Sequence, residues 1–135
     1  MTTTAHRPAI RPVNNRDPYA ASRVAVYKNL HKGCWSIRAL DGLHKGTVVA
    51  HADVVAIVNC RMHVNEKART RIAADSAREV HAWVVGTLAE VTLTNPQRLT
   101  YRPHERAAFF LAATGEPIWE APAVLFTDSA YIDRP

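Results

Sequence analysis

The sequence has only two cysteines, Cys34 and Cys60, and they lack the CxxC spacing of zinc and redox motifs. Two thiols are too few for a disulfide framework, so we expect them to be reduced and partly buried. No apolar run approaches the roughly 20 residues that a membrane-spanning helix requires, and the N-terminus has no hydrophobic segment typical of a signal peptide. These absences predict a cytoplasmic protein that has no membrane partner.

Motifs of the common catalytic classes are lacking as well. Ser36 and Ser129 have no GxSxG context, neither cysteine has a neighbouring histidine, and no Gly-rich phosphate loop is present. Catalytic groups can be assembled in space from distant residues, so an enzyme is not excluded. The sequence nevertheless favours a non-enzymatic protein without a cofactor.

What the chain does contain is enough apolar material for one core. Hydrophobic residues make up 47% of 135 residues, which suits a single domain. Trp35, Ile37 and Ala39 alternate with Ser36 and Arg38, and this period of two is typical of a half-buried strand. Strands are predicted at residues 24–27, 34–40, 46–49, 54–60 (with Met62 and Val64 as an extension), 91–93, 99–101, 109–111, 118–119 and 124–126.

One segment shows helical spacing instead. Apolar residues recur on one face of residues 66–85, Asn65 is a suitable N-cap, and Gly86 is a suitable C-cap. The alternative at its end is that Trp83, Val84 and Val85 already belong to a strand. We expect an α+β fold, in which a curved, mainly antiparallel sheet of six to eight strands packs against one helix at about residues 66–85.

The N-terminal residues show no apolar period. Arg-Pro occurs twice and Asp17-Pro18 follows, and residues before proline are disfavoured in helices. We therefore predict an extended, flexible basic arm over residues 1–22 and a single α+β domain over residues 23–135.

Positive charge is concentrated in the first fifty residues. They carry eight basic and two acidic side chains, a net charge of +6 within a chain of +5. Such an asymmetry favours a polyanionic partner, and an exposed aromatic ring can stack on a base. The alternative is that Trp35 is a core residue and the lysines only solvate the hairpin tips. The candidate nucleic-acid-binding residues are Tyr27, Lys28, His31, Lys32, Trp35, Arg38, His44 and Lys45.

A metal site is the weaker possibility. His51 and Asp53 are two residues apart, so on a strand they point to the same side, and His44, His63 or His81 could complete a ligand set by folding. No HxH or HExxH motif accompanies them. The simpler interpretation is that Asp53 accepts backbone hydrogen bonds in a turn and His51 packs at a strand end, with no metal.

Several motifs together are similar to a known family. They are Tyr27-x-Asn29-Leu30, His51-Ala52-Asp53, Val80-His81-Ala82-Trp83-Val84-Val85-Gly86-Thr87-Leu88 and Thr114-Gly115-Glu116-Pro117. Over about residues 26–131 the chain resembles a family of small uncharacterised phage and prophage proteins. The resemblance implies a phage or mobile-element origin and transfers no catalytic residue.

Three functional hypotheses follow. The first is a non-enzymatic phage protein that binds nucleic acid, or a host nucleoprotein, through its basic N-terminal hairpin face. The second, by analogy with other small phage proteins, is a protein-directed inhibitor of a host nuclease or defence complex, of the anti-CRISPR kind. The third and least favoured is a metal-assisted hydrolase built around His51 and Asp53.

Overall fold

The computed structural model describes residues 3–5, 10–29, 32–65, 82–102 and 109–133 as one large antiparallel sheet with a small accessory pair of strands. In spatial order the ten-stranded sheet runs β10-β9-β12-β11-β6-β7-β3-β4-β5-β2. In chain order its strands are β2 (Arg11–Pro12), β3 (Val24–Asn29), β4 (Cys34–Ala39), β5 (Val48–Ala52), β6 (Val55–Val64), β7 (Ala82–Leu88), β9 (Pro96–Tyr101), β10 (Phe109–Leu111), β11 (Glu120–Phe126) and β12 (Ala130–Asp133). The accessory pair is β1 (Thr3–Ala5) with β8 (Val91–Leu93).

The expected α+β class is wrong. Within the described residues the only helical element is a short 3-10 turn, η1 (Pro18–Ala20), and the remaining regular structure is antiparallel sheet. Residues 82–85 of the predicted helix form the start of β7, while residues 66–81 lie outside the described part of the chain. β7 pairs with β6 on one side and β3 on the other, and this tertiary pairing outweighs the helical spacing of its apolar residues.

Gly86 shows how β7 fits between its neighbours. It lies inside the strand and is not a helix C-cap, which corrects the prediction. A Cβ atom added there would lie 2.8 Å from the carbonyl oxygen of Val58 and 3.0 Å from the side chain of Ile57. Glycine is therefore required for the close approach of β6 to β7.

Most strands inferred from alternation are present, with shifted ends. β6 runs through Met62 to Val64, as its predicted extension indicated. Ile118 and Trp119, expected to form a strand, precede β11 without belonging to it, and β12 lies beyond Phe126, where no strand was predicted. The sheet has ten strands where six to eight were expected.

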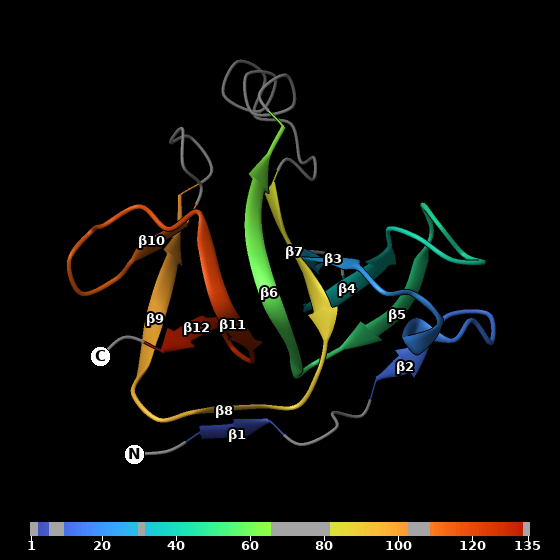
Figure 1. Cartoon of the computed structure of the whole chain (residues 1–135), viewed down its shortest axis with the longest axis horizontal. Coiled ribbons are helices and arrows are strands. Elements are labelled where there is room, and N and C mark those ends of the chain that lie inside the picture. Colours follow the sequence, from blue (N-terminus) through green and yellow to red (C-terminus); the bar gives the residue numbers. More distant parts are fainter. Residues whose placement is uncertain (1–2, 6–9, 30–31, 66–81, 103–108, 134–135) are drawn as a thin grey trace.

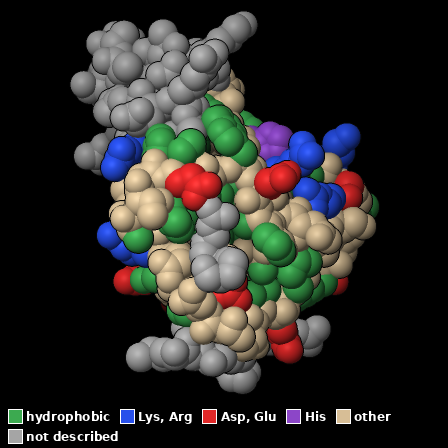
Figure 2. Space-filling view, turned by 60° about the vertical axis from the view of Figure 1, so that its left-hand side comes forward, with side chains coloured by type: hydrophobic (Ala, Val, Ile, Leu, Met, Phe, Trp, Pro, Cys, Tyr) green, Lys and Arg blue, Asp and Glu red, His purple; other side chains and the backbone are tan. Residues whose placement is uncertain are grey.

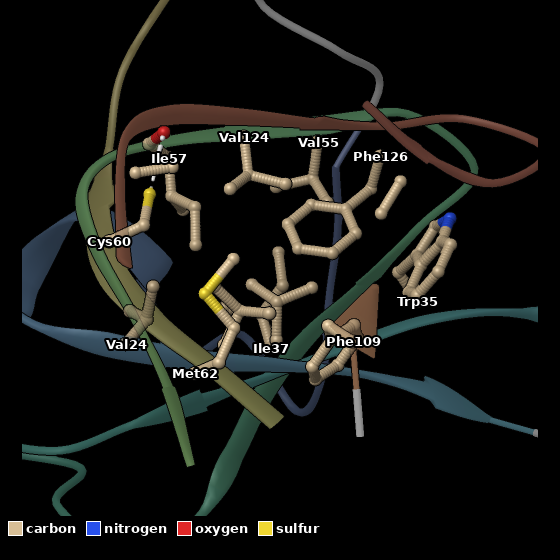
Figure 3. Packing of buried hydrophobic residues seen from close by; sticks show 14 of the residues in the cluster. Val24, Trp35, Ile37, Val55, Ile57, Cys60, Met62, Phe109, Val124 and Phe126 are labelled. Atoms are coloured by element: carbon tan, nitrogen blue, oxygen red, sulfur yellow. Dashed lines mark hydrogen bonds between the residues drawn. The ribbon is translucent and has the colours of Figure 1, made fainter. Parts of the chain in front are cut away.

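The sheet curves strongly around one core. Figure 1 shows β9, β11 and β12 on one side of the long β6–β7 pair and β3, β4 and β5 on the other. One cluster of buried side chains collects residues from both sides, including Ile37, Phe109 and Phe126 (Figure 3). Strands from the two sides of the β6–β7 pair meet at a contact that we call the seam. There the centre of the Trp35 ring lies 4.7 Å from that of the Phe126 ring, and Trp35 Nε1 donates to the carbonyl oxygen of Thr127 at 2.7 Å. The strands on either side of the β6–β7 pair thus meet through direct contacts.

The N-terminal segment contributes the edge strand β2 to the ten-stranded sheet and β1 to the accessory pair. β2 pairs with β5, the Arg16 guanidinium donates to the carbonyl oxygen of Val48, and Pro18 is buried. The division into a flexible arm and one domain stays a prediction. No helix among the described residues is long and apolar enough to cross a membrane.

Candidate functional site

The predicted hairpin residues do not share one surface. Trp35 is only 9% exposed and its ring packs on Phe126, so it is a core residue and cannot serve as a stacking platform. Lys28 is exposed at the end of β3, with Nζ 4.9 Å from the centre of the Trp35 ring and 3.2 Å from the carbonyl oxygen of Gly33, to which it donates. Lys32 is exposed in the turn that follows β3, and His31 lies outside the described residues.

The remaining hairpin residues lie elsewhere. Tyr27 and Arg38 are on the opposite side of the sheet from Trp35, with the Arg38 guanidinium carbon 5.6 Å from the centre of the Tyr27 ring. His44 and Lys45 are in the loop between β4 and β5, at the far end of β4 from Lys28. The sequence therefore groups residues that the fold separates into three places.

A different surface brings chemistry-bearing side chains together. In β3 to β7, residues flanked by core residues point away from the core, because successive side chains of a strand alternate. Strand order places these positions on five adjacent strands, β6-β7-β3-β4-β5. We call this side of the sheet the outer face; its polar and aromatic members are Tyr27, Ser36, Arg38, His51, Arg61, His63 and Trp83, of which Ser36 is buried.

Five members of the outer face are absent from the predicted nucleic-acid set: Ser36, His51, Arg61, His63 and Trp83. Trp83 is half-buried in β7 and pairs with exposed His63 in β6, and their rings are nearly parallel, with centres 6.2 Å apart and planes 6° apart. Arg61 is exposed two residues before His63. The signal that could have found Arg61 and His63 is their alternation with apolar residues at positions 60, 62 and 64.

A β-bulge sets which side chains of β6 point outward. The register between β6 and β7 shifts between Val58 and Arg61, and Asn59 adopts a positive φ of 54°. Ile57 points into the core before the bulge and Cys60 does so after it. The extra residue changes the phase of alternation, so Arg61 and His63 point outward.

The outer face carries positive charge. None of the outward positions of β3, β4, β5, β6 and β7 is an aspartate or glutamate. On the neighbouring strand β11, Glu120 pairs with Arg61 in the sheet register, so its side chain lies on the same side of the sheet. On the face that comes forward in Figure 2, acidic and basic side chains are mixed among hydrophobic ones.

His51 and Asp53 are engaged with different partners. Asp53 forms an ion pair with Arg11, its Oδ2 lying 3.1 Å from Nη1. His51 Nδ1 lies 3.2 Å from Ser36 Oγ, which also accepts a hydrogen bond from the Asn29 amide. Within the described residues no three histidine, cysteine, aspartate or glutamate side chains come close enough to hold a metal ion, and His81 lies outside them. The geometry gives the hydrolase hypothesis no support.

The protonation of His51 should couple to stability. Partial burial lowers the pKa of His51, and the nearby cations Lys32 and Arg11 lower it further. The folded pKa is then below the unfolded value of about 6.5, so the His51 contribution is fully present above pH ~6.5 and is lost as pH falls towards the folded pKa. When the pH is lowered from ~8 to ~5.5, the free energy of unfolding measured in urea should fall less for His51→Gln than for the wild type. Equal losses would contradict this coupling.

The cysteines are placed as expected for inert thiols. Cys34 and Cys60 are buried and not joined in a disulfide. Burial raises the pKa of Cys60 to about 12, and its Sγ lies 3.2 Å from the carbonyl oxygen of Ile57 (Figure 3). A thiol that stays protonated is a poor nucleophile, so Cys60 serves the core.

The chain is similar to a protein of known origin. A family model described as the Mycobacterium phage L5 gene 82 protein matches residues 18–134. The gene 82 protein of Mycobacterium phage L5 itself is 32% identical over 118 residues, covering 79% of this chain and 91% of the relative. No solved structure matches. The expected resemblance to small phage proteins is confirmed, and the chain belongs to the family of the Mycobacterium phage L5 gene 82 protein.

Proposed function

We propose that this phage-family protein is a non-enzymatic nucleic-acid-binding protein of the host cytoplasm, and that it binds through its outer face. The observation that carries the proposal is the juxtaposition of Arg38 and Arg61 with Tyr27 and Trp83 on a surface whose strands present no carboxylate outward. Cationic side chains neutralise phosphates, and aromatic rings stack on bases.

The contacts of the two arginines support this assignment. Both are exposed, and neither takes part in the Arg11–Asp53 ion pair, while Glu120 lies opposite Arg61 in the sheet register. Arg38 lies against the Tyr27 ring, which orients its guanidinium on the surface. The hairpin tips contribute less, because Lys28 and Lys45 lie at opposite ends of β4.

The decisive experiment measures binding of a labelled oligonucleotide by fluorescence anisotropy across a series of salt concentrations. The wild-type log K should fall linearly with log salt. The double variant Arg38→Gln/Arg61→Gln should bind more weakly, and the magnitude of its salt slope should be lower by about 1.4 to 1.8, since two phosphate contacts are lost.

A matched control removes the same charge elsewhere. Arg98 and Arg102 are exposed arginines in β9 and just after it, outside the outer face. The variant Arg98→Gln/Arg102→Gln should keep the wild-type slope. Binding that does not respond to salt, or equal losses in both double variants, would reject the proposal.

The inhibitor hypothesis predicts a different result. A host protein that stays bound to the wild-type chain after the lysate is treated with nuclease, and that Arg38→Gln/Arg61→Gln also retains, would favour a protein target. A partner released by nuclease, or lost with the two arginines, would favour nucleic acid.

A further inference from the structure

We infer that the ligand of the outer face is single-stranded nucleic acid, whose unpaired bases stack on Trp83 and Tyr27 while phosphates contact Arg61 and Arg38. This inference rests on the proposed function and adds the form of the nucleic acid to it. Three features of the structure support it: the width of the face, the placement of the rings, and the position of an arginine near each end of the group of rings.

The width of the face excludes the usual fit to duplex DNA. Five adjacent strands at about 4.8 Å spacing extend over about 19 Å. The major groove is about 12 Å wide and admits a helix or a two-stranded ribbon. A face of this width cannot enter the groove, whereas a single strand can lie along it with its bases turned towards the sheet.

The rings stand where such bases would lie. Trp83 is on β7, flanked in the sheet by β6 and β3, and the His63 ring of β6 is stacked nearly parallel to the Trp83 ring. Tyr27 is on β3, next to β7. All three side chains point away from the core; His63 is exposed, and Tyr27 and Trp83 are half-buried. Aromatic rings on a sheet surface are the standard platform for unpaired bases.

A cation lies near each end of the group of rings. Arg61 is two residues from His63 on the same strand, a separation of about 7 Å along β6. Arg38 lies over the Tyr27 ring. The row of rings formed by His63, Trp83 and Tyr27 therefore has an arginine beside each of its two ends, where phosphates that flank stacked bases can be contacted.

The first test uses the wild-type chain and needs no variant. Anisotropy with a labelled 20-nucleotide single strand, and with the duplex of the same sequence, should give at least about tenfold tighter binding to the single strand. Equal or tighter duplex binding that keeps the Arg38/Arg61 dependence would overturn the inference and leave the proposed function intact. No salt-dependent binding to either form would overturn both.

The second test removes the proposed platform. Trp83→Ala should weaken single-strand binding by about 5- to 150-fold, the range typical of losing one stacked base. Trp119→Ala is the matched control, because Trp119 is 49% exposed and lies outside the outer face. Trp83→Phe should retain most of the affinity, since it keeps an aromatic ring. Similar affinities for Trp83→Ala and Trp119→Ala, with both variants unfolding cooperatively, would reject the stacking role of Trp83.

Discussion

Trp35→Ala is expected to lower the free energy of unfolding by about 3–5 kcal/mol, the range for removing a large buried aromatic side chain. The ring is almost fully buried and contacts Phe126, which lies on the other side of the β6–β7 pair. Its Nε1 also satisfies the carbonyl oxygen of Thr127. Loss of the ring therefore leaves a cavity at the seam and an unsatisfied acceptor.

The measurement is urea denaturation followed by circular dichroism, with two comparison variants. Trp35→Phe keeps most of the apolar volume but not the donor to Thr127, so it should cost about 1–3 kcal/mol. Trp83→Ala makes the same change as Trp35→Ala at a half-buried position of the outer face and should cost clearly less. If Trp35→Ala were no more destabilising than Trp83→Ala, the assignment of Trp35 to the core would be wrong.

This contrast between two tryptophans shows what alternation can predict. The sequence correctly predicts that residues 34–40 form a strand, because apolar and polar residues alternate there. Alternation also places Trp35 on the same side of the strand as Ile37, so the sequence allows the interpretation that Trp35 is a core residue. What the sequence does not contain is the partner across the seam, since Phe126 is 91 residues away.

The wrong helix has a related cause. Short apolar runs fit a buried strand and a helix equally well, and the run Trp83-Val84-Val85 fits either the end of a helix or the start of a strand. The strand conformation is selected by pairing, because β3 and β6 form hydrogen bonds with β7 on its two sides. Pairing between distant segments cannot be read from one segment alone, and it decides the fold class here.

The predicted nucleic-acid set combines residues from both sides of the sheet, because proximity in the chain is not proximity on a pleated sheet. Tyr27 and Lys28 are consecutive, yet the tyrosine is on the outer face and the lysine extends over Trp35 on the other side. His63 and Trp83 are twenty residues apart and become neighbours through the β6–β7 register. The bulge at Asn59 then turns Arg61 and His63 outward.

Phe126→Ala is expected to destabilise the protein by about 3–5 kcal/mol, as much as Trp35→Ala. Phe126 is 1% exposed, ends β11, and pairs with Val55 in β6 and Ala130 in β12. Its ring belongs to the core cluster that joins strands on both sides of the β6–β7 pair (Figure 3). The ring thus contributes to the contact that keeps the sheet curved as well as to local packing.

A double-mutant cycle separates these two contributions. Trp35→Leu, Phe126→Leu and the double variant keep an apolar side chain at each site, so all three should still unfold cooperatively in urea. Because the two rings are in tilted contact, the cycle should give a coupling of about 0.5–1.5 kcal/mol.

Phe110→Ala is the matched control for Phe126→Ala: Phe110 is also buried, but it lies in edge strand β10 and outside the main cluster. It should cost about 1–2 kcal/mol less than Phe126→Ala. A coupling near zero, together with equal costs for the two phenylalanines, would mean that the seam does not hold the two sides of the curved sheet together.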